Sequence, residues 1–495
     1  MKISKIFYLK NVFLLVMMLL CFNVSTAQGN RSLRGADHPE KSSSARDIYV
    51  ALNGKNSNNG TLNEPVNTIQ RGLELVKPGF TVFVRSGTYK EKLNFPRGGQ
   101  KDKVITLKPY RMERVIVSGE GLSVSGSEAL VSVSGVNYIV IERLDICNFK
   151  SAAAFVNVDG IAVKAGSSNI TLRKNKIYNI ENNASAEMGR SGHGIHVIGN
   201  TAVVMTKILV EENEIFDCNT GYSENITING YVDGFEVRKN KVYNGENIGI
   251  VAAGGYAANI NPAYNYARNG IIADNEVFNL DGKTGPIPAF KDHNGAIGIY
   301  VDGARNIIVE RNLIKDCGRG IGIVSETNNF PTQECTVRNN LVSGCSLAGI
   351  YLGGYVGYTG GGTYNCFVVN NTIYCNNKDL GYSNEVEGEL RLTEHCYNNV
   401  IKNNLIYARP KDLLIHKYSS TGSGNTIDHN TYYTTTTTTT GQPQWIWDST
   451  SGNPVGFRDW KKNSGQDANS ILKIVSPKFY SNLSRKWKRF QQSKI

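Results

Sequence analysis

The sequence lacks the local signatures of several enzyme classes. It contains no Gly-x-Ser-x-Gly elbow, no His-Glu-x-x-His motif and no phosphate-binding loop. The glycine-rich stretch after Gly354 has no strand-to-helix context of the kind that a nucleotide site needs. These absences argue against α/β serine hydrolases, zinc metalloproteases and nucleotide-dependent enzymes.

The body of the chain has little net charge. The formal charge is +12, but three lysines lie in the first ten residues, and residues 476–495 hold six Lys or Arg and no acid. About +3 remains for the rest of the chain, which is too little to indicate a polyanionic partner. We therefore expect no binding to nucleic acid.

Long apolar runs are scarce as well. The run from residue 12 to 22 follows Lys2, Lys5 and Lys10 and precedes the small residues Ser25 to Ala27, which is the order of a secretory signal. We expect residues 1–27 to be a signal peptide and the mature chain to be secreted, to the periplasm or the extracellular space. No later run approaches the roughly 20 residues that span a bilayer, so we expect no membrane span.

Eight cysteines follow this segment, in a context where disulfides can form. Their positions in the repeat described below instead indicate two columns of free thiols, since free cysteine packs as a small hydrophobic residue. One column contains Cys147, Cys218, Cys317, Cys345 and Cys375, and the other contains Cys335, Cys366 and Cys396. Structural disulfides are the alternative.

One phrase recurs many times along the chain. Alternating apolar residues precede an Asn and a second short apolar pair follows it, so two strands meet at a tight bend that a left-handed Asn can occupy. These asparagines, 26 to 38 residues apart, are Asn175, Asn213, Asn240, Asn275, Asn312, Asn340, Asn371, Asn404 and Asn430. We expect them to form one buried line.

A third short strand precedes each phrase, for example GIHVI, NITIN, NIGIV, AIGIY and GIGIV. Three short strands per turn with a stacked Asn predict an all-β fold, the right-handed parallel β-helix, in which rungs lie about 4.8 Å apart. An antiparallel sandwich would need hairpin turns every 8 to 12 residues and does not explain a fixed Asn column.

The predicted organisation divides the chain into six parts. Residues 1–27 are the signal peptide, 28–46 a disordered linker, 47–125 an N-terminal cap with the first rungs, 126–435 the β-helix repeats, 436–476 a C-terminal cap and 477–495 a basic tail. Residues 65–76 have the pattern of an amphipathic helix that covers the open end of the solenoid. Trp445, Trp447, Phe457 and Trp460 supply the apolar surface of the C-terminal cap.

Two stretches resemble a known superfamily. The segment from Asp47 to Glu91 is similar to the N-terminal segment of many secreted bacterial pectate-lyase-like proteins, and the Asn repeats resemble the right-handed β-helix repeats of that superfamily. Residues 159–164 resemble the Asp-Gly-x-Ala-x-Lys stretch of one calcium-dependent branch, which implies that Asp159 is a metal ligand. One rung later that branch has paired aspartates, where this chain has His193 and His196.

Function is expected on the sheet that is formed by the third strands, because long loops flank it. These loops are residues 180–192, 254–268, 281–294, 353–365 and 376–386. The outward column of this sheet is predicted to be Ala162, His196, Thr227, Gly249, Gly298, Gly322, Tyr351 and Arg391. Three consecutive glycines would make a flat floor for a sugar chain.

The candidate residues lie around this floor. Asp302 and Glu326 are expected at equivalent positions on adjacent rungs, where two carboxylates would bind calcium or act as a glycosidase pair. Catalytic candidates are His193, His196, Arg319, Asp302 and Glu326; substrate-binding candidates are Glu224, Asn229, Glu246, Tyr300, Tyr351 and Arg391; metal candidates are Asp302, Glu326 and Asp159. A fallback site is the rung of Glu389, Arg391 and His395.

The resemblance implies a carbohydrate-active enzyme, first of all a polysaccharide lyase that cleaves uronate-containing chains by β-elimination with calcium as the implied cofactor. For this reaction His196 or another nearby base would take the C5 proton. The alternatives are a glycoside hydrolase with Asp302 and Glu326, and a non-catalytic polysaccharide-binding β-helix. A monomer is expected.

Overall fold

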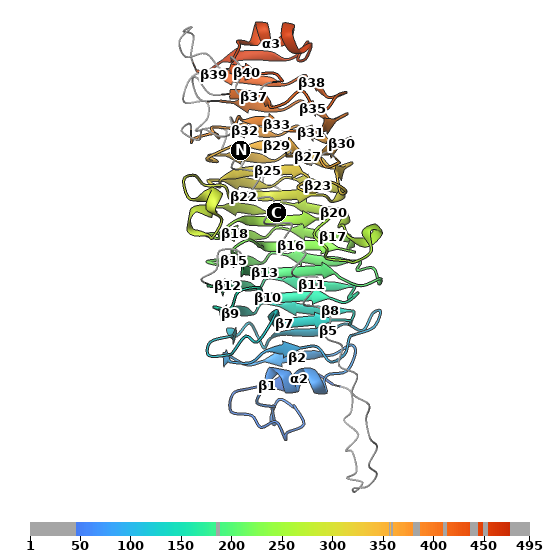
Figure 1. The fold of residues 1–495 in the computed structure, drawn as a ribbon. Coiled ribbons are helices and arrows are strands. Elements are labelled where there is room, and N and C mark those ends of the chain that lie inside the picture. Colours follow the sequence, from blue (N-terminus) through green and yellow to red (C-terminus); the bar gives the residue numbers. More distant parts are fainter. Residues whose placement is uncertain are drawn as a thin grey trace.

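The computed structural model describes residues 46–184, 189–355, 357, 360–379, 387–408, 413–435, 444–448 and 454–475. The chain winds into a rod in which the strands of three parallel sheets stack from one end to the other (Figure 1). This confirms the parallel β-helix with three strands per turn.

One sheet carries the candidate residues and is called the site sheet. Its twelve strands among the described residues are β4 (Leu93–Asn94), β7 (Glu128–Ser134), β10 (Val156–Lys164), β13 (Arg190–Gly199), β16 (Glu224–Gly230), β19 (Ile248–Ala253), β22 (Ile297–Asp302), β25 (Arg319–Val324), β29 (Ile350–Gly353), β33 (Leu390–Leu392), β37 (Leu413–Lys417) and β40 (Gln444–Ile446).

The second sheet begins at the N-terminal end of the rod. Its main path is β1 (Ile48–Val50), β2 (Thr81–Val84), β5 (Ile105–Pro109), β8 (Ile139–Glu142), β11 (Ile170–Arg173), β14 (Ile208–Glu211), β17 (Asp233–Arg238), β20 (Arg268–Ala273), β23 (Arg305–Glu310), β27 (Thr336–Arg338), β31 (Phe367–Val369), β35 (Val400–Lys402) and β38 (Thr426–Asp428). Three short strands lie beside this path: β26 (Thr332–Gln333), β30 (Thr363–Tyr364) and β34 (Cys396–Tyr397).

The third sheet completes each rung. It contains β3 (Gly87–Tyr89), β6 (Val115–Ser118), β9 (Asp145–Ser151), β12 (Lys176–Asn182), β15 (Glu214–Phe216), β18 (Lys241–Tyr243), β21 (Glu276–Phe278), β24 (Leu313–Lys315), β28 (Leu341–Ser343), β32 (Thr372–Tyr374), β36 (Leu405–Tyr407), β39 (Thr431–Thr434) and β41 (Ile471–Ile474).

The repeat asparagines form one buried line, as predicted. In each step the side-chain amide donates to the Oδ1 atom of the next Asn, from Asn175 through Asn430, at 2.9 to 3.1 Å. The bend itself differs from the prediction, because the left-handed conformation falls on the preceding residue, for example Asp274 (φ 58°) before Asn275. The Asn side chain points inward and satisfies backbone groups of the bend.

The cysteines are free thiols, but the two predicted columns are partly wrong. Lys315 pairs with Ser343, so Cys317 and Cys345, each two residues further on, follow the same column. Tyr374 pairs with Ser343, so Cys375 falls one residue short of this column, and Asn376 accepts from the Cys345 amide at 3.0 Å. Cys147 pairs with Tyr178, which places it two residues away from the column of Cys218.

The second column has a similar displacement. The amide of Cys335 donates to the sulfur of Cys366 at 3.3 Å, whereas Cys396 pairs with Thr363. Asn399 continues the column and accepts from the Cys366 amide at 2.9 Å. Small asparagine and cysteine side chains therefore share the same interior positions.

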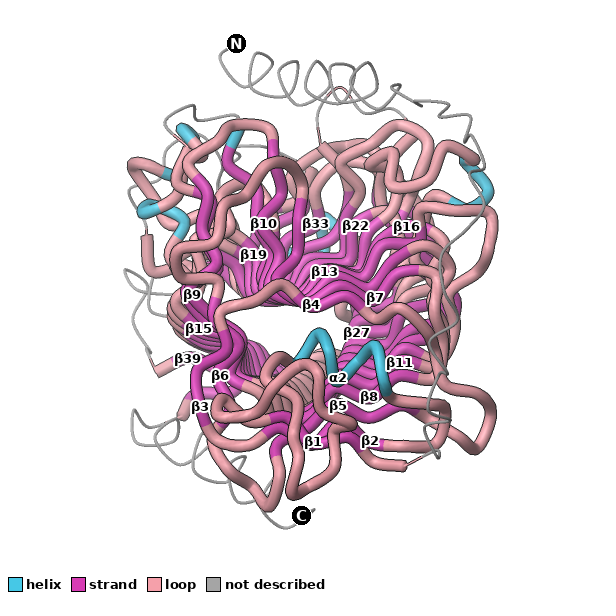
Figure 2. Tube along the Cα trace, turned by 90° about the horizontal axis from the view of Figure 1, so that it is seen from below, coloured by secondary structure: helices cyan, strands magenta, loops and turns pink. Residues whose placement is uncertain are grey.

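Both ends of the rod are covered. Helix α2 (Ile69–Leu75) lies across the N-terminal opening between the sheets (Figure 2), and Thr68 caps it by accepting from the Arg71 amide. It begins later than the predicted residue 65 but buries Ile69 and Leu73. At the other end, α3 (Phe457–Ser464) packs Trp460 beside Trp447.

Some predicted segments lie outside the described residues: the signal peptide, almost all of the linker, the basic tail and most of the threonine run. Within the part of the chain that the structure describes, no helix has the length and apolar character to cross a membrane.

Candidate functional site

The outer face of the site sheet is less flat than the sequence predicts. In register, His196 pairs with Thr227, Thr227 with Val251, Val251 with Tyr300 and Tyr300 with Gly322. A Cβ atom on Gly249 would lie 2.7 Å from Val277 Cγ1, and one on Gly298 would lie 2.6 Å from Ile314 Cγ2, so both glycines face the interior. Of the three predicted floor glycines, Gly322 alone lies on the outer face.

A second apolar cluster takes the place of that floor. Tyr300 and Tyr351 belong to it, and the half-buried rings of Tyr256 and Tyr355 pack against it. Its buried members are Ile248, Val251, Ala253, Ile297, Tyr300, Val324, Ala348 and Tyr351. Gly322 leaves room between two of the rings, since a Cβ atom there would meet Tyr351 Cζ at 2.6 Å and Tyr300 Cδ2 at 2.7 Å.

Two carboxylates lie at the edge of this cluster and form what we call the carboxylate–tyrosine centre, Asp302, Glu326, Tyr256 and Tyr300. The prediction that Asp302 and Glu326 occupy equivalent positions is wrong, because Asp302 pairs with Val324. The two acids are nevertheless joined, since the Glu326 amide donates to Asp302 Oδ1 at 3.0 Å. The hydroxyl of Tyr300 donates to Glu326 Oε1 at 2.7 Å, and that of Tyr256 donates to Asp302 Oδ2.

The electrostatics of the centre are those of a buried negative charge. Burial raises the pKa of Tyr256 well above its usual value, and the charges of Asp302, Glu326 and Glu224 raise it further. The pKa of Tyr300 is raised in the same way, by burial and then by Glu326. Both tyrosines therefore remain protonated hydrogen-bond donors at neutral pH.

A histidine cluster lies on β10 and β13, and β13 is three strands from β22, which carries Asp302. Asp159 Oδ1 is 2.8 Å from His193 Nδ1, and Asp159 Oδ2 is 3.2 Å from His196 Nδ1. The two imidazole rings stack with centroids 3.9 Å apart. Glu224 of β16 faces the other ring nitrogen of His193 at 3.7 Å and accepts from Thr227 Oγ1 at 2.8 Å.

The two histidines differ in charge. Burial lowers the pKa of His193, but Asp159 and then Glu224 outweigh it and raise that pKa to about 9. Burial and the charge of His193 lower the pKa of His196, against the influence of Asp159. Burial acts upward on the pKa of Asp159, yet the two histidines hold it well below its usual range. A charged and a neutral imidazole thus lie side by side at neutral pH.

The residues around Asp159 do not fit calcium. Calcium takes six to eight oxygen ligands, whereas both oxygens of Asp159 face imidazole nitrogens. At Asp302 and Glu326 the donors are oxygens, so a calcium site there stays a prediction.

Arg319 lies apart from the histidines. Four strand spacings separate β13 from β25, or about 19 Å, so Arg319 and His196 do not contact the same sugar unit. Arg319 and Arg391 both donate to Glu387 Oε1, at 2.7 and 2.8 Å. No motif or spacing in the sequence singles out Glu387, which follows a long loop.

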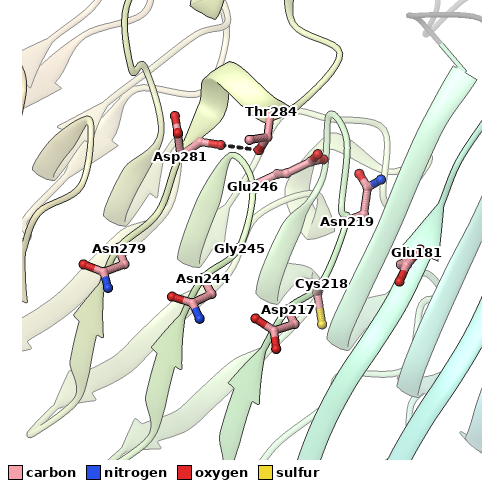
Figure 3. Close-up of a pocket in the computed structure, with 10 residues that line it drawn as sticks. All are labelled: Glu181, Asp217, Cys218, Asn219, Asn244, Gly245, Glu246, Asn279, Asp281 and Thr284. Carbon is pink, nitrogen blue, oxygen red and sulfur yellow. Dashed lines mark hydrogen bonds between the residues drawn. The ribbon is translucent and has the colours of Figure 1, made fainter.

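Two other candidates, Glu246 and Glu389, accept hydrogen bonds from the protein's own backbone and side chains. Glu246 lies in a cavity of 390 Å³ between the site sheet and the third sheet, together with Asp217, Asn219 and Asp281 (Figure 3). It accepts from the Gly221 amide at 3.1 Å, away from the outer face of the site sheet. Glu389 of the fallback rung is buried and accepts both from the amide and from the side chain of Asn376.

Of the two loops that the sequence predicts as walls, residues 254–268 contact the carboxylate–tyrosine centre, whereas Asp281 and Thr284 of the other line the cavity around Glu246. Residues 254–268 contain a short 3-10 turn (Pro262–Tyr264), and Asn259 donates to the Gly199 and Thr201 carbonyls at 2.9 and 2.7 Å. This loop brings Tyr256 to Asp302. Residues 281–294 contain two further turns (Gly282–Thr284 and Pro288–Phe290). Asn229 lies two rungs from Asp302 in the same outward column.

Comparison with known proteins supports the fold and the family. Residues 48–254 match the family model described as "Pel9A-like, right handed beta helix region". The chain is 32% identical over 425 residues to "Uncharacterized protein YwoF" of Bacillus subtilis (strain 168), which covers 86% of this chain and 87% of YwoF. It is also 34% identical over 80 residues to "Pectate lyase PEL9" of Emericella nidulans, covering 16% of this chain and 20% of that protein.

Among solved structures, the lacto-N-biosidase GH136 from Eubacterium ramulus is similar with a TM-score of 0.52 and 14% identity, covering 87% of this chain and 68% of that chain. At this identity the likeness concerns the fold alone. Taken with the matches in sequence, it agrees with a right-handed solenoid. The chain belongs to the same family as YwoF and is a right-handed β-helix protein of the pectate-lyase-like superfamily.

Proposed function

We propose that this protein is a secreted, monomeric carbohydrate-active enzyme that hydrolyses glycosidic bonds of a polysaccharide with Asp302 and Glu326. The family match and the similarity to a pectate lyase support the substrate class. The observation that carries the reaction is the pair of carboxylates held together at the edge of a tyrosine cluster.

The contacts suggest a role for each acid. Asp302 accepts from the Glu326 amide and from Tyr256, and such donors stabilise an ionised carboxylate. Asp302 is therefore the nucleophile or the general base. Glu326 also accepts one hydrogen bond, from Tyr300, but it is less buried than Asp302 and lies next to the charge of that carboxylate. We therefore assign to Glu326 the proton for the leaving oxygen.

The charge of the site supports hydrolysis over elimination. Hydrolysis passes through an oxocarbenium-like, positively charged transition state, which nearby carboxylates stabilise. In addition to burial, the charges of Asp302 and Glu224 both raise the pKa of Tyr256, which places two such carboxylates near the same point. Elimination next to a uronate carboxylate instead builds negative charge, and Arg319 lies beside a carboxylate of its own, Glu387.

The tyrosines supply the surface for the sugar chain. Tyr300 and Tyr351 lie on the two strands that flank Gly322, with ring centroids 6.2 Å apart. Each is only 2% exposed, so these two rings form the buried support of the surface. The rings of Tyr256 and Tyr355 are only partly buried and pack against this support. Aromatic rings provide large contact areas with a polar tip, which suits pyranose rings. We infer that the polysaccharide lies along the solenoid axis, over Gly322 and toward Glu224.

Elimination remains a second candidate because of one observation. Asp159 accepts from Nδ1 of His196, which leaves Nε2 of this neutral imidazole as a base. In that case His196 takes the C5 proton and the charged His193 faces the developing charge.

One experiment separates these reactions. Wild type, Asp302→Asn, Glu326→Gln and His196→Gln are incubated with neutral and uronate polysaccharides, and both reducing ends and the ultraviolet absorbance of unsaturated products are followed. We expect reducing ends without unsaturation, and a loss of about 100-fold or more in the first two variants, the size of a lost acid–base group.

Glu236→Gln is the matched control, because this acid is partly exposed and lies on the second sheet, away from the site sheet. Unsaturated products whose formation depends on His196 would show that the reaction is elimination and not hydrolysis. Wild-type rates in both carboxylate variants would remove the centre from catalysis, and binding without either product would indicate a binding protein.

A further inference from the structure

The histidine cluster lies outside the carboxylate–tyrosine centre and has the composition of a metal site. One ligand atom from each of Asp159, His193 and His196 lies within 4.8 Å of the others. All three side chains are buried, with 4 to 8% of each residue exposed. The register between β10 and β13 brings them together, since Asp159 pairs with His193.

The distances are close to those around a metal. Tetrahedral coordination with metal–ligand bonds of about 2.0 to 2.2 Å puts neighbouring ligand atoms about 3.4 Å apart. The two Nδ1 atoms lie 2.8 and 3.2 Å from the Asp159 oxygens. The two rings are stacked with their planes 19° apart, so they must also turn toward each other before both Nδ1 lone pairs point at one ion.

A second, independent observation concerns the far side of His193. Ligating histidines commonly donate their other ring nitrogen to a carboxylate, which fixes the ring and makes the ligand more basic. Here Nε2 of His193 faces Glu224 Oε2 at 3.7 Å, and Thr227 holds that same oxygen at 2.8 Å. Thr227 and Glu224 thus orient His193 with Nδ1 toward Asp159.

We propose that Asp159, His193 and His196 bind one first-row divalent transition metal of the zinc type. Imidazole nitrogen selects such metals, whereas calcium takes oxygen ligands. The ion replaces the protons that the Nδ1 atoms share with Asp159, and solvent completes its coordination. It joins two adjacent rungs of the site sheet and stabilises this part of the solenoid, whichever reaction the carboxylate centre performs.

The test uses the full mature chain, purified without a histidine tag and treated with a chelator that is then removed. Zinc chloride and, separately, calcium chloride are titrated by calorimetry, and the melting temperature is measured with and without each ion. We expect one equivalent of zinc at micromolar affinity or tighter, a raised melting temperature, and no calcium binding that depends on Asp159.

Four variants locate the site. Asp159→Asn and His196→Gln should lose at least 100-fold in zinc affinity, and Glu224→Gln about 10- to 100-fold. His429→Gln is the matched control, because this histidine is exposed at the surface, and should bind as wild type does.

If a variant fails to fold, the visible spectrum of the cobalt-substituted wild type reports nitrogen and oxygen ligation directly. Wild-type protein that binds no stoichiometric zinc or cobalt would overturn the proposal, as would zinc affinity unchanged in a folded Asp159→Asn variant. Neither result depends on any polysaccharide substrate, so it leaves the proposed hydrolysis to its own test.

Discussion

Replacing Asn275 by leucine tests the asparagine ladder. The side chain makes four hydrogen bonds: it donates to the Val237 carbonyl at 2.9 Å and to Asn312 Oδ1 at 2.9 Å, and it accepts from the amide and the side chain of Asn240 at 2.9 and 3.0 Å. At about 1 kcal/mol net for each bond, the loss is about 4 kcal/mol. A leucine side chain would make some apolar contacts in place of these bonds, but the buried amide and side chain of Asn240 would lose their acceptor.

The effect should be local, because each rung of a solenoid contacts mainly its neighbours. Native-state hydrogen exchange is therefore the assay. The amide of Asn240, which donates to Asn275, and the amides of β18 and β21 should exchange about 1,000-fold faster, since 1.4 kcal/mol corresponds to a factor of ten. Amides of β5 and β35 should keep their protection.

The control is Asn94→Leu, which changes an exposed asparagine of β4. Exchange at Asn240 that rises by less than tenfold would contradict the reasoning, because the ladder would then contribute little beyond packing. Equal loss of protection along the whole rod would contradict the nearest-neighbour picture.

Three further predictions concern single residues. Gly322→Ala should lower activity on polysaccharide and leave the circular dichroism unchanged, because the new Cβ atom displaces the Tyr300 and Tyr351 rings; full activity would argue against a substrate path over this glycine. Burial raises the pKa of the Glu387 carboxyl, but Arg319 and Arg391 outweigh it and bring that pKa down to about 2. The stability this carboxylate adds is complete above its ordinary pKa of 4.5 and is lost as pH falls from there toward 2. The melting temperatures of wild type and Glu387→Gln should therefore differ at pH 6 and converge near pH 2, and a constant difference would refute the ion pair as the cause. Burial raises the pKa of Cys345 well above its usual value, so this thiol should stay unmodified by a thiol reagent until the protein is denatured, and rapid labelling of the folded protein would contradict its position inside the solenoid.

The positions of the candidate site residues were only partly predictable. The sequence identified Asp302, Glu326, His193 and His196 as neighbours of one sheet, because they flank strands with the same apolar pattern. It placed Asp302 opposite Glu326, whereas the register pairs Asp302 with Val324. Counting from an apolar residue cannot reveal which isoleucine begins the inward alternation: Ile299, and not Ile297, pairs with Ile321.

Residues brought in by loops were missed for a related reason. Tyr256 reaches Asp302 across 46 residues of sequence, and Glu387 reaches Arg319 across 68. Nothing near either residue in the sequence indicates its partner, because the length of a loop does not define its path. The predicted cysteine columns were also wrong at two places, because Asn376 and Asn399 occupy positions at which a cysteine was expected.

The sequence by itself determined the solenoid. Each rung repeats the same apolar alternation and the same Asn, so the residues of one rung are enough to specify its three strands. The ladder from Asn175 to Asn430 then follows from the stacking of similar rungs. Only the tertiary structure decided which side chains share the outer face, since the hydrogen bonds between strands set the register and a shift of two residues there exchanges Gly249 for Val251 beside Tyr300.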